Sequence, residues 1–139
     1  MALKIKPVSP REVQTRWTPD LVADGWTPVS DFFLRNYHRI GITSNEAMLV
    51  VHLMTHKWDA HSPYPGFTSL AKRMGIGATQ VRNHARSLEA KGCLHRVIRT
   101  GTTNRFVLTP LFMKLEALRA ADHAAREQTP PAATESATA

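Results

Sequence analysis

The feature that most constrains the fold is a pair of helical patterns joined by Gly75-Ile76-Gly77. Apolar residues recur at helical spacing on both sides of this turn, which predicts a short helix over about 67–74 and a second over about 78–91. The inward-facing positions are Leu70, Ala71, Met74, Val81, Ala85 and Leu88. Ala71 is small enough for the two helices to cross closely, and Ile76 can fill the gap between them. This is the spacing of a helix-turn-helix.

The segment after this pair has the pattern of a β-hairpin. Residues 93–99 and 104–109 are rich in β-branched and apolar side chains and are separated by Thr100-Gly101-Thr102-Thr103. Helices followed by a hairpin predict a mainly α chain with a small β-hairpin. The fold class is therefore α+β, a winged helix-turn-helix with an N-terminal extension and a C-terminal helix.

Capping signals place the remaining helices. Ser30 is suited to cap a helix that ends at Gly41, since glycine readily takes the left-handed conformation after a last turn. Thr43-Ser44-Asn45-Glu46 fits a capping box and predicts a mostly apolar helix that ends at about Trp58. Thr109-Pro110 supplies an N-cap and a first-turn proline for the last helix.

Composition divides the chain into three parts. Residues 1–23 contain three prolines among mixed charges and predict an extended arm, in which Trp17 and Leu21 suggest docking. Residues 24–121 form the winged helix-turn-helix domain. Residues 122–139 are predicted to be a disordered tail, because the chain from Glu127 holds almost no large apolar side chain.

The excess charge is confined to one block. The window 67–108 holds eight of the 18 Lys and Arg residues and one of the 11 acids, Glu89, so ten basic and ten acidic residues remain elsewhere. The window thus carries the whole net charge of +7. A contiguous basic segment on a helix-turn-helix pattern is the electrostatic footprint of a nucleic-acid face.

Positions of the second helix that the core does not use can hydrogen-bond to DNA. Gln and Asn can bind adenine and Arg can bind guanine, each worth about 1–3 kcal/mol of discrimination. The candidate recognition-helix residues are Thr79, Gln80, Arg82, Asn83 and Arg86. Of these, Arg86 favours phosphate contact, and Lys72 and Lys91 are further candidates for contacts with the DNA backbone. The candidate wing residues, for a minor groove or flanking phosphates, are Arg99, Thr100, Thr102, Thr103, Asn104 and Arg105.

Two stretches carry a family resemblance. Residues 70–81 with 88–94 resemble the winged helix-turn-helix of bacterial and phage DNA-binding proteins. Residues 29–37, 40–42, 46–49, 52–53, 64–65 and 108–111 are similar to the N-terminal domain of DnaD-type replication-initiation proteins and of related plasmid initiators. The resemblance spans about residues 25–118 and implies a winged helix whose N-terminal element often mediates self-association.

Two departures from that family pattern matter. Gly77 stands where the family often has a Ser or Thr N-cap, a replacement that costs little. The chain also has no second domain of the kind DnaD proteins use for DNA, so we expect the winged helix itself to bind DNA.

Other kinds of site are poorly supported by the sequence. His52 and His56 have metal-like spacing, but Leu53 stands where a zinc-protease helix needs its Glu, so we expect no metal. Cys93 is best explained as a small packed side chain, although a redox role is open. No nucleophile–base pair, phosphate loop, cofactor motif or small-molecule site is evident. The chain is expected to be a non-enzyme without a membrane partner, cytoplasmic and associated with the nucleoid.

These patterns together predict a sequence-specific double-stranded DNA-binding protein. We expect a homodimer that acts as a transcriptional regulator or as a replication initiator of a bacterial, plasmid or phage element. The dimer contact could come from the arm or from Leu111, Leu115 and Leu118 of the last helix. The alternative is a protein–protein adaptor of a replication-initiation complex with little DNA binding of its own.

Overall fold

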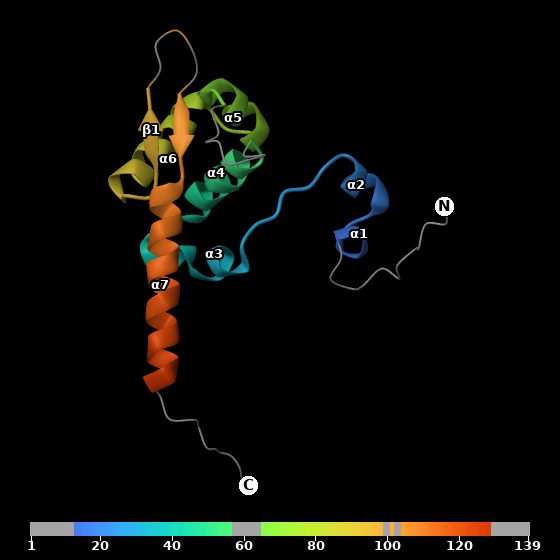
Figure 1. Cartoon of the computed structure of the whole chain (residues 1–139). Helices are drawn as coiled ribbons and strands as arrows, with labels where there is room; N and C mark the ends of the chain where they lie inside the picture. Colours follow the sequence, from blue (N-terminus) through green and yellow to red (C-terminus); the bar gives the residue numbers. More distant parts are fainter. Residues whose placement is uncertain (1–12, 57–64, 99–100, 102–103, 129–139) are drawn as a thin grey trace.

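The computed structural model describes residues 13–56, 65–98, 101 and 104–128. The elements are, in order, α1 Val13–Arg16, α2 Pro19–Ala23, α3 Asp31–Asn36, the 3-10 helix η1 Tyr37–Ile40, α4 Ser44–Met54, α5 Phe67–Met74, α6 Ala78–Ala90, β1 His95–Val97, β2 Arg105–Val107 and α7 Thr109–Gln128. The predicted fold class is confirmed: helices surround the core, and a two-stranded hairpin follows the helix-turn-helix (Figure 1).

The core forms where α4, α5 and α6 pack against one another. Leu49 and Leu53 of α4 are fully buried with Leu70 of α5 and Leu88 of α6, and Phe106 of β2 covers them from the hairpin side. Fully burying one such side chain contributes about 1.5–3 kcal/mol. This core fixes α6 relative to α4 and the hairpin, and thereby fixes which side chains of α6 face outward.

The predicted capping residues hold the ends of α3 and α4. The Glu46 N–H donates to Thr43 Oγ1 at 3.2 Å, and the Thr43 N–H donates to Glu46 Oε1 at 2.9 Å, which confirms the capping box. The Phe33 N–H donates to Ser30 Oγ at 3.2 Å. The α-helix predicted up to Gly41 instead ends at Asn36 and continues as η1, while α4 ends at Met54, before the predicted end at Trp58, which lies outside the described residues.

The turn between α5 and α6 has the geometry that its glycines predict. Gly75 has a φ of 70°, in the left-handed region that favours glycine, and the Ile76 N–H donates to the Ala71 carbonyl at 3.1 Å. At the start of α6, the Gly77 N–H donates to Gln80 Oε1 at 3.0 Å. Only half of a capping box is present here, because glycine has no side chain to return the bond.

The hairpin is short and antiparallel. Arg96 lies opposite Phe106, and His95 and Val97 lie opposite Val107 and Arg105. Leu108 then leads into α7, and its carbonyl accepts the Phe112 N–H at 3.1 Å. Leu108 rather than Thr109 is therefore the N-cap, one residue earlier than the sequence predicts.

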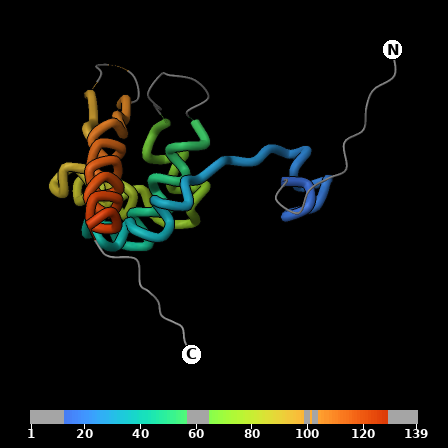
Figure 2. Tube along the Cα trace, turned by 60° about the horizontal axis from the view of Figure 1, so that its bottom comes forward, coloured from blue at the N-terminus to red at the C-terminus, as the bar shows by residue number. Residues whose placement is uncertain are grey.

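Both ends of the chain differ from the sequence-based prediction. The arm is not wholly extended, because it contains α1 and α2; the Leu21 N–H donates to Thr18 Oγ1 at 3.2 Å, with Pro19 in the first turn. Trp17 and Leu21 remain exposed rather than docked on the core, and the arm stands away from the body in two views (Figures 1 and 2).

The segment 122–128, predicted to be disordered, belongs to α7. Alanine-rich sequence in this helix favours helix formation. Asp122 accepts two bonds from the Arg39 guanidinium, at 2.8 and 3.0 Å, which ties the second half of α7 to η1. These bonds raise the pKa of Arg39 and lower the pKa of Asp122.

Candidate nucleic-acid interface

Helix α6 presents three different surfaces beside its buried face. The side chains that point away from the core are exposed and come from Thr79, Asn83 and Arg86. One flank turns toward α4, and the opposite flank turns toward the hairpin. Because helix neighbours recur every three or four positions, each flank forms a row along the helix. The predicted DNA-binding residues are divided among all three surfaces.

The outward face keeps the hydrogen-bonding groups that sequence analysis assigned to base readout. The Thr79 hydroxyl, the Asn83 amide and the Arg86 guanidinium make no hydrogen bond or ion pair with other described residues. An Asn side chain can bind adenine bidentately, and an Arg side chain can bind either guanine or a phosphate. This face therefore offers donors and acceptors of the kinds that contact base edges and phosphates in a major groove.

Gln80 lies on the flank that faces α4. Its Oε1 accepts the Gly77 N–H, as described above, and the side chain borders a pocket against His52. One of its two hydrogen-bonding groups is thus already used by the fold. The amide nitrogen and one lone pair of Oε1 are left to reach a base.

Arg82 lies on the hairpin-facing flank. Its guanidinium carbon is 5.3 Å from the centroid of the Phe67 ring, and that of Arg96 is 5.7 Å from the same centroid. The Phe67 ring meets Phe106 edge-on, with centroids 5.9 Å apart. Stacking on a ring face holds the guanidinium in one orientation while leaving its charge intact. Arg82 is thus held between α6 and the hairpin, beside the outward face.

Lys91, which the sequence predicts to contact a phosphate, is paired within the fold. Its Nζ donates to Glu46 Oε1, and the Glu46 side chain is only 4% exposed against 30% for Lys91. Burial alone would raise the pKa of Glu46, but bonds from Lys91, Ser87 and the Thr43 N–H outweigh it, and the pKa is lowered. Lys91 therefore neutralises a buried carboxylate.

The two remaining cations of the block that sequence analysis left unassigned also have partners. Arg96 Nη2 lies 3.2 Å from Glu89 Oε1, so the block's single acid is neutralised by the hairpin. Arg73 Nη1 lies 2.9 Å from His56 Nε2. Within the described part of the chain, the exposed cations of the block that have neither an ion pair nor a side-chain hydrogen bond are Lys72, Arg86 and Arg105.

The predicted wing lies only partly within the described residues. Arg105 is exposed at the start of β2, and Asn104 beside it is half-buried. Arg99, Thr100, Thr102 and Thr103 lie outside the described residues.

Two contributors to this surface were not predicted from the sequence. Phe67 serves as the platform under Arg82 and Arg96, and Glu46 binds Lys91 from 45 positions earlier in the chain. No sequence signal indicates the first contact, because it depends on the crossing of α5, α6 and the hairpin. The capping box did single out Glu46, although for a local role.

Within the described ranges, no three His, Cys, Asp or Glu side chains are grouped closely enough to hold a metal ion. Cys93 is buried, and burial raises the pKa of its thiol. Among the described helices, none has both the length and the apolar character needed to cross a membrane.

Comparison with known proteins places this geometry in a family. The N-terminal domain of DnaD from Geobacillus kaustophilus HTA426 superposes with a TM-score of 0.64 at 24% identity, covering 79% of this chain and 94% of that one. A MepR mutant from S. aureus bound to an oligodeoxyribonucleotide gives a TM-score of 0.45 at 18% identity, covering 69% and 72%. No curated protein sequence matches the chain. The family model described as the DnaD N-terminal domain matches residues 29–127, and the chain belongs to this family.

Proposed function

We propose that this protein binds double-stranded DNA through α6 and the hairpin. The observation that carries the proposal is the sorting of charge: ion pairs neutralise Lys91 and Arg96, whereas Lys72, Arg86 and Arg105 stay exposed. Exposed cations without internal partners release counterions from DNA when they contact phosphates, which is the main source of affinity.

Each part of the surface has its own role in the proposed complex. Thr79 and Asn83 contact base edges in the major groove, and Arg86 contacts a base or the adjacent phosphate. Arg82, held on Phe67, and Lys72 contact the backbone beside α6. Arg105 contacts the backbone next to the hairpin. Gln80 has a smaller role than the sequence suggests, because it caps α6.

Family membership favours replication initiation over transcription regulation as the biological role. The DnaD-type resemblance implies a replication-initiation protein of a bacterial, plasmid or phage element, working on the nucleoid in the cytoplasm. Genome-wide mapping of binding sites distinguishes the two roles. Sites concentrated at a replication origin support initiation, and sites spread over promoters support regulation.

A salt titration on a random duplex tests DNA binding against the adaptor alternative. For a DNA-binding protein, log Kobs falls linearly with log[salt], with a slope of about −0.9 per phosphate contact. An adaptor shows almost no salt-dependent affinity.

Sequence-specific binding needs a second measurement on a duplex selected from a random pool. We expect Asn83→Ala with Arg86→Ala to bring the affinity for the selected site close to that for random duplex, since each base contact is worth about 1–3 kcal/mol. The matched control is Arg119→Ala, which removes an exposed cation from α7. A double variant that still prefers the selected site as strongly as the wild type contradicts the assignment of α6.

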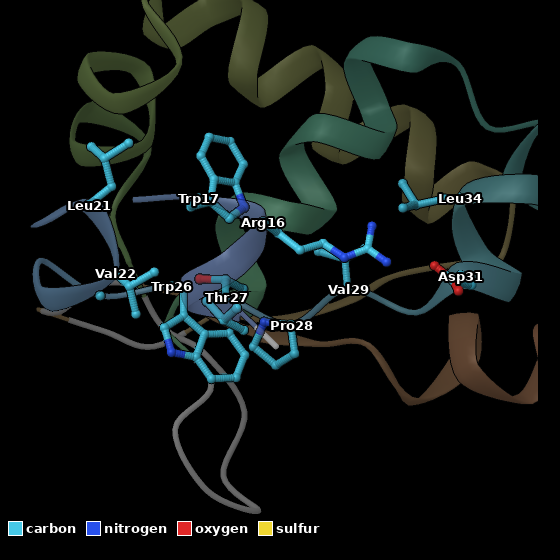
Figure 3. A pocket seen from close by; sticks show the side chains of 12 residues that line it. Arg16, Trp17, Leu21, Val22, Trp26, Thr27, Pro28, Val29, Asp31 and Leu34 are labelled. Atoms are coloured by element: carbon cyan, nitrogen blue, oxygen red, sulfur yellow. The ribbon is translucent and has the colours of Figure 1, made fainter. Parts of the chain in front are cut away.

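The arm supports a second part of the proposal, a homodimer. Trp17, Leu21 and Trp26 are 67%, 53% and 52% exposed. They border a groove of about 760 Å³ between α1, α2 and the start of α3, which Val22 and Val29 also line; Figure 3 shows these side chains. Large apolar side chains gathered at one exposed place mark an interaction surface.

Sedimentation equilibrium tests this dimer contact. We expect Trp17→Ala with Leu21→Ala to shift the protein toward monomer. Met113→Ala is the control, because Met113 is an equally exposed apolar residue on α7. If the Met113 variant dissociates and the arm variant does not, the contact lies on α7 instead.

A further inference from the structure

A pocket of about 300 Å³ lies on the side of the helix-turn-helix that faces α4. Its polar lining comes from three helices: Asn45 and His52 from α4, Arg73 from α5, and Gln80 and His84 from α6. The outward face of α6, formed by Thr79, Asn83 and Arg86, is not part of it. Apart from Gln80, which has a minor part in the proposed DNA contact, the pocket is separate from the DNA-binding surface, and it was not evident in the sequence.

The hydrogen-bonding groups in this pocket favour an anion. His52 Nδ1 is buried and has no partner among the described residues. Arg73 has a guanidinium that can only donate, so its Nη1 donates to His56 Nε2 at 2.9 Å and the His56 ring is neutral. No other described residue accepts a hydrogen bond from Arg73, so its remaining N–H groups are left for an occupant. None of the described lining residues is acidic.

The lowered pKa values of His52 and His56 indicate a positive electrostatic field that no described lining residue balances. Burial, and then the Arg73 guanidinium, lower the pKa of His52 and the pKa of His56. A nearby carboxylate would have the opposite effect. The nearest acid along α4, Glu46, is already bound to Lys91. An anionic occupant would therefore supply the missing charge.

One side of the pocket is apolar. Met48, Met74 and Ile76 line it opposite the polar groups. Methionine side chains adapt to ligands of different shape. The volume is at the small end of the range of about 300–1,000 Å³ for ligand sites, so the occupant has a compact body.

We propose that this pocket binds a small organic anion, a phosphate monoester or carboxylate attached to a compact apolar body. Arg73 donates to the anionic head group, and the imidazole of His52, which lines the pocket, lies beside it. The apolar body lies against Met48, Met74 and Ile76. The proposal does not depend on DNA binding, because the site is assembled from α4, α5 and α6 alone.

NMR titration of the full chain tests the proposal without DNA. The probes are phenyl phosphate and benzoate. Inorganic phosphate represents the head group alone, and phenol represents the apolar body alone. We expect saturable shifts of the Met48 and Met74 methyl resonances with phenyl phosphate or benzoate, and the stronger of the two identifies the head group. We expect at least tenfold weaker binding of inorganic phosphate, and no saturation with phenol. The imidazole resonances of His52 should titrate at higher pH in the bound protein.

Two variants separate a built site from general attraction of anions. Arg73→Ala should weaken binding at least tenfold, and Arg73 is exposed, so the domain should keep its fold. Arg86→Ala removes a cation from the outward face of α6 and should leave binding unchanged. Arg73→Lys keeps the charge without the fork of donors and should bind with intermediate strength.

Three outcomes would overturn the proposal. The first is a set of shifts that grow linearly with both organic anions and never saturate. The second is an equal loss of binding in Arg73→Ala and Arg86→Ala. The third is a response of the pocket resonances to an added DNA duplex with none to phenyl phosphate or benzoate, which would assign the site to a DNA phosphate.

Discussion

The basic block contains two sets of cations that differ in their partners. Lys91 and Arg96 lie in ion pairs within the fold, with Glu46 and Glu89. Lys72, Arg86 and Arg105 lie on the exposed surface without such a partner in the described chain. In the sequence all five look alike. The comparison teaches that a run of charge indicates a nucleic-acid surface only after the cations that the fold itself uses have been removed from it.

One of the two pairs, Lys91 with Glu46, exists because the carboxylate has two functions. Glu46 must lie at the start of α4 to complete its capping box, and that position is covered by α6. A buried carboxylate is costly unless it is bonded to a cation, and Lys91 supplies that cation from the end of α6. The pair thereby joins the start of α4 to the end of α6.

Removing the carboxylate should give the largest effect on stability. We expect Glu46→Ala to lower the free energy of unfolding by about 3 kcal/mol, the lower end of the range for breaking a buried pair, since Lys91 is partly exposed. Urea denaturation followed by circular dichroism measures this loss. Glu116→Ala, which removes an exposed acid from α7, should change stability by less than about 0.5 kcal/mol. Equal effects of the two variants would show that the Glu46–Lys91 pair contributes nothing.

The unpaired set should instead affect binding. Replacing Lys72, Arg86 and Arg105 by Ala should reduce the slope of log Kobs against log[salt] by about 2.7 on a random duplex, at about 0.9 per lost phosphate contact. Lys91→Met should leave that slope unchanged. If Lys91→Met reduces the slope as much as one of the three exposed replacements does, the paired and the exposed cations do not differ in DNA binding.

Local patterns in the sequence predicted most of the fold. The capping box at Thr43, the turn at Gly75 and the apolar spacing of α5 and α6 each depend on a few neighbouring residues, so the sequence shows them directly. The two ends were harder to predict. Proline in the arm suggested extended chain although Thr18 caps α2, and the tail was given too early a start because Asp122 bonds to Arg39 from far along the sequence.

The candidate site could be predicted only in part for the same reason. Helical spacing identifies Thr79, Asn83 and Arg86 as positions outside the core. It does not tell which flank meets α4 and which meets the hairpin, because that depends on how the helices cross. Gln80 and Arg82 therefore looked equivalent in the sequence, although one caps α6 and the other stacks on Phe67.

Acidification should reveal the contribution of the ion pair to stability at a different pH from that of the histidines. His52 and His56 have pKa values lowered from the ordinary 6.5, and Glu46 has one lowered from 4.5. A lowered pKa means that the unfolded chain binds more protons, so the stability is present above the ordinary value and is lost as the pH falls toward the lowered one. We expect a first loss below about pH 6.5 and a second below about pH 4.5.

Substitutions assign these two losses of stability, with urea midpoints measured from pH 8 to pH 3. His52→Gln with His56→Gln should remove much of the first loss and keep the second. Glu46→Gln should do the reverse. A first loss that is unchanged in the double histidine variant would mean that other groups cause it.

The smallest effect is expected at the turn, where neither set of cations contributes. Gly77 caps α6 without a side chain, its φ is −78°, and an added Cβ would meet only Gln80 Oε1, at 3.9 Å. Gly77→Ser should therefore raise the free energy of unfolding by about 0.5 kcal/mol, since the hydroxyl completes the capping box and the unfolded chain loses freedom. Thermal denaturation of Gly77→Ser and Gly77→Ala side by side separates the hydroxyl from the methylene. Because the serine leaves the Gln80 bond in place, the affinity for the selected duplex should not change. A changed affinity would show that Gln80, freed or moved by the new cap, takes part in DNA contact.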